Sequence, residues 1–260
     1  MASESIKFEQ VGAVAKITLN RPNVFNSFNR EMALALQEVL DTCSKDKGIR
    51  AIYLTGEGKA FCAGQDLQEA TDPNGPGIDR IVVEHYNPII LKLRAIEKPI
   101  VCAVNGVAAG AGANIALACD ITVAKESSAF IQAFSSIGLI PDSGGTFFLP
   151  RLIGMQRATA LMMLADKVSA SDAAAMGMIY KAIADDQFEE TSMAIAIKLA
   201  DRPTVGLGLT KRLLNESHQN NLADQLNREG DEQIVAASSK DYNEGVQAFL
   251  EKRKPNFKGN

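Results

Sequence analysis

Short apolar runs, each followed by turn-forming residues, are the pattern that organises the first half of this 260-residue chain. Such runs lie at residues 50–55, 100–104 and 121–124, and residues 13–19 alternate between apolar and polar. Continuous apolar runs of this length are typical of strands that are buried on both faces. Residues 30–43 have helical spacing, and Asn29 is a candidate N-cap. Strands separated by helices predict an α/β fold with a largely parallel sheet.

The last quarter of the chain has a different pattern. Beyond about residue 191 the sequence becomes wholly helical and more charged, and no linker-like segment precedes it. We therefore expect one core domain over residues 1–199 and a helical region over residues 200–260. The length is within the range of a single large domain.

Composition argues against several classes of protein. The net charge is −4, so there is no overall basic field to attract nucleic acid, and an aromatic content of 6% with no tryptophan weakens the case for base stacking. The N-terminus has no apolar leader, and the weakly polar residues 99–119 are broken by asparagines. Four scattered cysteines form no C-x-x-C pair, which argues against a metal site. We expect a cytoplasmic protein with no metal and no contact with membranes or nucleic acid.

Two turns rich in small residues follow predicted strands and lead into predicted helices. They are residues 61–67 (FCAGQDL) and residues 105–114 (NGVAAGAGAN), the second opening a helix over residues 115–119. The first amides of a helix have no intrahelical acceptor, and small residues allow close approach to the backbone. Two such turns side by side could direct two N–H groups at one oxygen, as in an oxyanion hole. Close packing of helix on strand is the alternative interpretation.

A third segment, residues 137–146 (IGLIPDSGGT), holds one carboxylate among apolar and turn-forming residues. Asp142 directly precedes a predicted helix through Phe147 and Phe148, so it could be an N-cap. A partly desolvated carboxylate also has a raised pKa and can carry a proton. The nucleophile elbow, the phosphate loop and the dinucleotide fingerprint are all absent from the sequence.

Together, in this order and spacing, the three segments resemble the crotonase (enoyl-CoA hydratase/isomerase) superfamily. The resemblance extends from residue 19 to residue 253. It implies a spiral of repeated strand–strand–helix units within the α/β class. It also implies that residues 200–260 form a C-terminal helical trimerisation region.

The resemblance assigns roles to individual residues. The backbone N–H groups of Gln65 and Ala111 would form the oxyanion hole, and Asp142 would carry the proton. Substrate-binding positions would be Val24, Ala63, Asp66, Leu67, Phe249 and Lys252, with the last two sometimes acting across a subunit boundary. His85 is expected to be a partly exposed helix residue.

The reaction implied is an isomerisation. The positions of the two glutamates that hydratases use hold Asn114 and Phe134 here, which leaves Asp142 as the single acid. Within the superfamily the three segments are most similar to enzymes that convert 1,2-epoxyphenylacetyl-CoA to oxepin-CoA, and a shift of 3-enoyl-CoA to 2-enoyl-CoA is expected too. The alternatives are a general fatty-acid Δ3,Δ2-enoyl-CoA isomerase and a non-catalytic partner subunit of a hydratase.

The resemblance also implies what the protein binds. The substrate is expected to be an acyl-CoA thioester, and no separate cofactor is expected because coenzyme A is part of that substrate. A homotrimer or a dimer of trimers is the expected assembly, and an enoyl-CoA hydratase of the same pathway is a further candidate partner.

Overall fold

A computed structural model describes residues 4–260 and contains two β-sheets. The six-stranded sheet has the order β1-β2-β3-β5-β7-β10, in which β1 and β2 form an antiparallel hairpin and the other neighbours are parallel. Its strands are β1 (Ile6–Val11), β2 (Val14–Leu19), β3 (Ala51–Gly56), β5 (Ile100–Val104), β7 (Ile121–Lys125) and β10 (Lys181–Ile183). The four-stranded sheet consists of β4 (Ala60–Cys62), β6 (Val107–Ala109), β8 (Ala129–Ile131) and β9 (Val168–Ser169).

Successive strands alternate between the two sheets. β3, β5 and β7 lie in the larger sheet, and each is followed a few residues later by β4, β6 or β8 in the smaller one. After β4 and β6 a helical segment returns the chain to the larger sheet, and after β8 the chain returns there by way of β9, so the unit strand–strand–helix repeats. The α/β spiral expected from the sequence is confirmed.

Helices cover both faces of the larger sheet. On one face, residues such as Ile52 and Cys102 belong to the main core with α1 (Arg30–Lys45), α4 (Asn87–Ala95) and α5 (Ala111–Leu117). On the other, Tyr53 packs with α9 (Phe188–Ala200). The shorter helical segments are 3₁₀ turns at Pro22–Val24 and Ser135–Ile137, α2 (Leu67–Thr71), α3 (Gly77–Arg80), a π-helix at Ile81–Tyr86, α6 (Gly145–Ile153), α7 (Met155–Leu164) and α8 (Ala170–Ala175).

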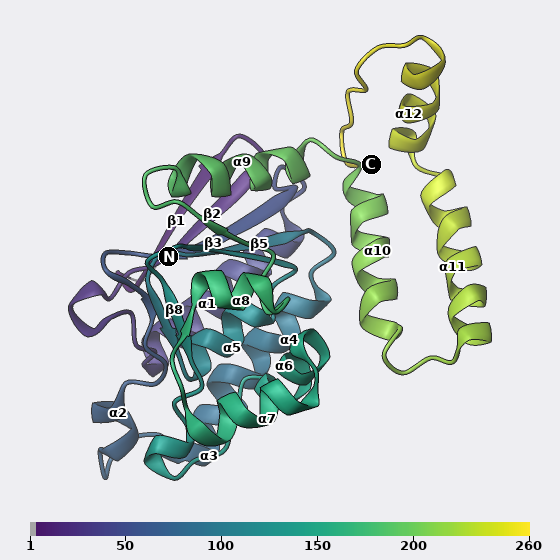
Figure 1. The fold of residues 1–260 in the computed structure, drawn as a ribbon. Coiled ribbons are helices and arrows are strands. Elements are labelled where there is room, and N and C mark those ends of the chain that lie inside the picture. Colours follow the sequence, from purple (N-terminus) through teal and green to yellow (C-terminus); the bar gives the residue numbers. More distant parts are fainter. Residues whose placement is uncertain (1–3) are drawn as a thin grey trace.

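The last three helices form an arm that extends to one side of the core (Figure 1). They are α10 (Thr204–Glu216), α11 (Leu222–Ala237) and α12 (Lys240–Leu250). The chain end returns to the base of the arm, where Arg50 donates hydrogen bonds to the carbonyls of Arg202 and Phe257 and to Thr204 Oγ1, at 2.6 to 2.9 Å. The division at residues 199 and 200 stays a prediction, and it falls at the end of α9.

The structure gives the outcome of several details of the sequence analysis. Asn29 does cap α1, because its side chain accepts from Met32 N at 3.0 Å. The helix expected over residues 115–119 begins four residues earlier, at Ala111, because the small residues of the turn are themselves its first turn. All four cysteines are buried free thiols.

Within residues 4–260, no helix is both long enough and apolar enough to cross a bilayer.

Candidate active site

The two small-residue turns lie against each other. Gly64 has a positive φ of +94°, and a Cβ added there would lie 3.1 Å from the Ala109 carbonyl oxygen and 3.5 Å from the Ala111 nitrogen. A Cβ at Gly112 would lie 2.5 Å from the carbonyl oxygen of Cys62. The turn after β4 and the start of α5 can therefore come this close only because both positions are glycine.

The backbone amides of Gln65 and Ala111 are both available at this junction. Phe28 N donates to the Gly64 carbonyl at 2.7 Å and Asp66 N donates to the Phe28 carbonyl at 2.8 Å, so the Gln65 N–H between them faces away from Phe28. Ala111 is the first residue of α5, and such an amide has no intrahelical acceptor. Two amides arranged in this way could hold one oxygen that bears developing negative charge.

Hydrogen bonds fix the side chain of Gln65. Its Oε1 accepts from the Tyr86 hydroxyl at 2.8 Å, and its Nε2 donates to Glu69 Oε2 at 3.1 Å. Glu69 in turn accepts from the Arg30 backbone N–H at 2.8 Å. The residue that carries one of the two backbone amides is therefore held through both polar atoms of its side-chain amide.

Asp142 lies in a strained loop before α6. Ser143 and Gly144 both have positive φ, at +51° and +74°, and α6 then begins at Gly145 with Gly144 at its N-cap. The N-cap interpretation of Asp142 is thus wrong: two left-handed residues separate it from the helix, and no side chain in the described part of the chain caps α6. Its Oδ1 accepts instead from Ser143 Oγ at 2.8 Å.

The environment of Asp142 suits a proton carrier. Burial raises the pKa of the Asp142 carboxyl above its ordinary value, although the Ser143 hydrogen bond works in the opposite direction. Burial, followed by the nearby Cys62 and Asp142 groups, also raises the pKa of Tyr86. The Asp142 backbone carbonyl accepts a hydrogen bond at 2.9 Å from Asn114 of α5, so the loop that holds the acid lies against the helix that begins at Ala111.

The positions expected to contact coenzyme A divide into two groups. Val24, Ala63 and Leu67 are exposed around the first turn, and Ala63 N donates to the Phe25 carbonyl at 3.0 Å. Asp66 caps α2 through Gln68 N and accepts from Arg21 at 2.9 Å, so both of its carboxylate oxygens have protein partners.

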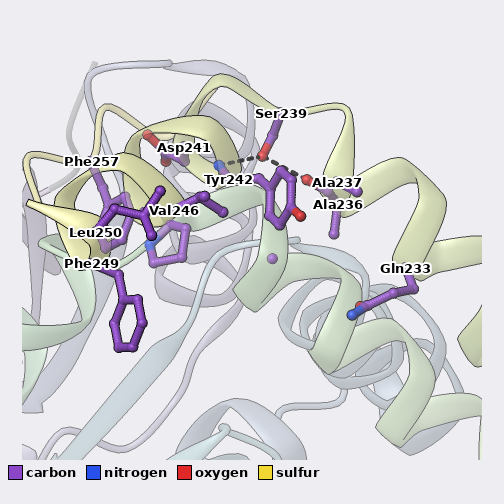
Figure 2. Close-up of a pocket in the computed structure, with 13 residues that line it drawn as sticks. Gln233, Ala236, Ala237, Ser239, Asp241, Tyr242, Val246, Phe249, Leu250 and Phe257 are labelled. Atoms are coloured by element: carbon purple, nitrogen blue, oxygen red, sulfur yellow. Dashed lines mark hydrogen bonds between the residues drawn. The ribbon is translucent and has the colours of Figure 1, made fainter.

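Phe249 and Lys252 lie in the arm and are not brought to this junction within one chain. Phe249 is 83% exposed at the end of α12, beside a pocket of about 460 Å³ between the arm helices. Figure 2 shows its ring directed away from the neighbouring Tyr242 and Ser239. Both residues stay predictions as ligand contacts.

The π-helix at Ile81–Tyr86 holds two residues whose position the sequence did not indicate. His85 was expected to be partly exposed, but that interpretation is wrong: it is fully buried, because the π-helical turn directs both His85 and Tyr86 inward. π-Helical turns are frequent at functional sites but carry no clear sequence pattern. His85 Nε2 lies 3.3 Å from Arg30, and burial lowers the pKa of its imidazole.

The strand–strand–helix spiral over two sheets places the molecule in the crotonase class of α/β proteins. Comparison with known sequences is consistent with that class, and the chain belongs to the enoyl-CoA hydratase/isomerase family, whose model matches residues 9–260.

Individual relatives cover nearly the whole chain. It is 48% identical over 249 residues to the 1,2-epoxyphenylacetyl-CoA isomerase of Escherichia coli (strain K12), a match that covers 95% of each chain. It is 42% identical over 259 residues to a probable enoyl-CoA hydratase of Rhodobacter capsulatus, which covers 100% of both. The crystal structure of an enoyl-CoA hydratase from Bacillus anthracis has a TM-score of 0.92 and 33% identity, covering 98% of this chain and 100% of that one.

Proposed function

We propose that the protein is an acyl-CoA thioester isomerase that converts 1,2-epoxyphenylacetyl-CoA to oxepin-CoA and also shifts 3-enoyl-CoA to 2-enoyl-CoA. The observation that carries the proposal is the Asp142 carboxyl, whose pKa is raised by burial and whose loop is bonded at 2.9 Å to Asn114 of α5, the helix that begins with the Ala111 amide. The relative at 48% identity with the epoxide activity supports the choice of substrate.

The proposed chemistry on a 3-enoyl-CoA needs one proton carrier. The Asp142 carboxylate removes a proton from the carbon next to the thioester, and the electron pair passes to the carbonyl oxygen as a dienolate. The Gln65 and Ala111 amides hold that oxygen, and loss of one such donor typically costs about 2.7–4 kcal/mol of barrier. Asp142 then returns the proton two carbons further along, which gives the conjugated 2-enoyl-CoA.

On the epoxide, the same groups would serve the ring expansion, in which the carbon–carbon bond of the epoxide breaks and the oxygen enters a seven-membered ring. The amides would hold the thioester oxygen while Asp142 moves a proton between the side-chain carbon and the ring, so that the product is an isomer of the substrate. A general Δ3,Δ2-enoyl-CoA isomerase of fatty-acid metabolism is the alternative, since it uses the same proton shift. Both versions place the proton transfer on one residue.

Hydration is the second candidate activity, because a relative at 42% identity is described as a probable hydratase. Addition of water needs groups to activate the water and to manage the second proton. Asn114 and Phe134 occupy the positions where the family's hydratases have glutamates, and both are buried. An amide and a phenyl ring cannot exchange protons in this way, so the residues favour isomerisation. In a non-catalytic partner subunit, the buried Asp142 carboxyl with its raised pKa would have no proton to transfer, so this carboxyl favours an enzyme.

We further propose that the arm mediates a homotrimer, alone or as a dimer of trimers. Several of its large apolar side chains are exposed in the single chain: Leu214, Leu222, Leu226, Ile234, Val235, Val246, Phe249 and Leu250. Apolar surface of this extent marks an interaction site. A neighbouring copy could cover it, and Phe249 and Lys252 could then reach the coenzyme A held by that copy.

The activity is tested by presenting the purified protein with three thioesters. These are 1,2-epoxyphenylacetyl-CoA, a 3-enoyl-CoA and a 2-enoyl-CoA, with products separated by liquid chromatography and identified by mass and absorbance. We expect products of unchanged mass from the first two and no gain of water by the third. Rapid hydration of the 2-enoyl-CoA would favour the hydratase, and binding without any reaction would favour the partner subunit.

A further inference from the structure

The side chain of Asn114 connects two elements of the candidate site. Asn114 lies in α5, one turn after Ala111, and its Nδ2 donates to the backbone carbonyl of Asp142 at 2.9 Å. The same carbonyl accepts from Gly145 N at 2.9 Å. The helix that offers one candidate oxyanion amide is thus tied directly to the loop that holds the proton carrier.

The orientation of this amide is fixed by a second buried residue. Gln132, just after β8, donates from Nε2 to Asn114 Oδ1 at 2.8 Å. Because Asn114 Oδ1 already accepts there, its Nδ2 must face the Asp142 carbonyl. Gln132 Oε1 is buried without a hydrogen-bond partner among the described residues. An unsatisfied buried acceptor costs free energy, and it persists only where the surrounding structure holds it.

The packing around Asn114 leaves little room for any other arrangement. Asn114 is fully buried, and a Cβ added at Gly145 would lie 2.3 Å from its Nδ2. The start of α6 can therefore approach α5 only because residue 145 is glycine. The neighbouring positive φ of Ser143 stores strain in the loop, and the Asn114 bond opposes relaxation of that strain.

We propose that Asn114, oriented by Gln132, is a positioning residue that holds the Asp142 loop in register with the Ala111 amide. On this view Asn114 does more than fill the site of an absent glutamate, because it fixes the separation between the proton carrier and the oxyanion donors. This inference rests on the proposed function for its kinetic consequences, but the tie between Asn114 and Asp142 is testable without activity.

The first variant is Asn114→Leu, which has a similar size and no donor. With a 3-enoyl-CoA substrate we expect kcat to fall about 10- to 100-fold, because a displacement of the order of 1 Å can have that effect, with little change in KM. In an Asp142→Asn background the same substitution should lower the residual rate no further. Equal fractional losses in both backgrounds would overturn the proposal.

The second readout is independent of turnover. Carbon-13 NMR titration of the aspartate carboxyls, with Asp142→Asn used for assignment, follows the ionisation of Asp142 directly. When the loop is released, the carboxyl becomes more hydrated, so its raised pKa should fall toward the ordinary value in Asn114→Leu. If that pKa stays at its position in the natural protein, the positioning role is wrong, even if the natural protein proves to have another activity.

Two further variants separate positioning from general loss of packing. Ser192→Ala removes another buried hydrogen bond, to Tyr53 at 2.9 Å on the α9 side of the sheet, and should lower stability while kcat and the Asp142 titration stay unchanged. Gln132→Met keeps Asn114 but frees its amide to rotate. It should therefore lower kcat and the pKa of Asp142 in the same direction as Asn114→Leu, by smaller amounts. It also serves if Asn114→Leu does not fold. A Gln132→Met protein that matches Ser192→Ala in both readouts would contradict the proposal.

Discussion

At the scale of single residues, Asp142 is held where its charge is costly. Burial raises the pKa of its carboxyl, so the folded chain binds a proton there more tightly than the unfolded chain does. The ionised form therefore lowers the free energy of unfolding at neutral pH, and this cost disappears at acidic pH, where both states are protonated. Such a cost is the usual sign of a group kept for function rather than for stability.

This cost gives a prediction with a definite sign. Asp142→Asn keeps the shape and can still accept the Ser143 hydrogen bond, but it removes the buried charge. We expect the variant to have a higher thermal midpoint than the natural protein at pH 7 and an advantage that shrinks toward about pH 4, near the ordinary pKa of aspartate. Calorimetry over this pH range measures it. A variant less stable at pH 7 would show that Asp142 serves mainly to hold its loop.

The close contact of the two turns gives a second residue-scale prediction. In Gly112→Ala the new Cβ would lie 2.5 Å from the Cys62 carbonyl oxygen and 2.7 Å from its Sγ, so α5 must move away from β4. Overpacking of this kind costs about 1–3 kcal/mol, and the Ala111 amide would shift with its helix. Chemical denaturation and turnover of a 3-enoyl-CoA should both decline, whereas Gly230→Ala, which meets open space, is the matched control. Unchanged turnover in Gly112→Ala would argue against a role for the Ala111 amide.

The sequence predicted roles for Gln65, Ala111 and Asp142 because the glycine-rich segments around them resemble those of a known family. It gave no sign of Tyr86 or of the hydrogen bond from Asn114, because both depend on contacts between residues far apart in the chain. The N-cap interpretation of Asp142 failed for a related reason. A positive φ at a serine is set by the surrounding fold and has no counterpart in local composition.

At the scale of elements, four of the six strands of the larger sheet (β2, β3, β5 and β7) were predicted to within one residue, whereas β1 and β10 were not predicted. β3, β5 and β7 are continuous apolar runs, and burial on both faces produces that pattern. The strands of the smaller sheet have two or three residues each, too few for any periodicity. They followed only from the family resemblance, which predicted the strand–strand–helix repeat.

The junction of core and arm offers a prediction at this scale. Arg50 holds the start of α10 and the end of the chain through three acceptors. Arg50→Met keeps the aliphatic length but removes all three bonds, and hydrogen bonds to a charged group contribute about 1.5–3 kcal/mol each, less where solvent competes. We expect faster amide hydrogen exchange in residues 202–206 and 255–259. If the amides of these two segments exchange at the same rate in Arg50→Met as in the natural protein, packing alone holds the arm.

At the scale of the whole molecule, the arm extends away from the core (Figure 1). Several large apolar side chains of the arm are exposed in the single chain. The sequence indicated a charged, wholly helical tail, and only the family resemblance indicated what covers it. The exposed apolar side chains of the arm would be covered by another chain. The residue pattern of a single chain does not identify that partner.

Substitution on the arm tests the proposed trimer. Ile234 is 73% exposed on α11, and Ile234→Asp would bury a charge in any interface that covers it. Burying an isoleucine contributes about 1.5–3 kcal/mol, so we expect a shift from trimer to monomer by light scattering after size exclusion. Tyr180→Asp, at a side chain exposed to a similar extent outside the arm, should leave the mass unchanged. A natural protein that is monomeric at micromolar concentration would contradict the trimer.

The central claim, that Asp142 carries the proton of an isomerisation, is tested most directly in heavy water. The natural protein and Asp142→Asn are each given a 3-enoyl-CoA, and formation of the conjugated thioester and deuterium incorporation are followed together. We expect both processes in the natural protein and a loss of at least about 100-fold in the variant, in the range for removal of a general acid–base group. Equal isomerisation and equal exchange by the two proteins would contradict the claim.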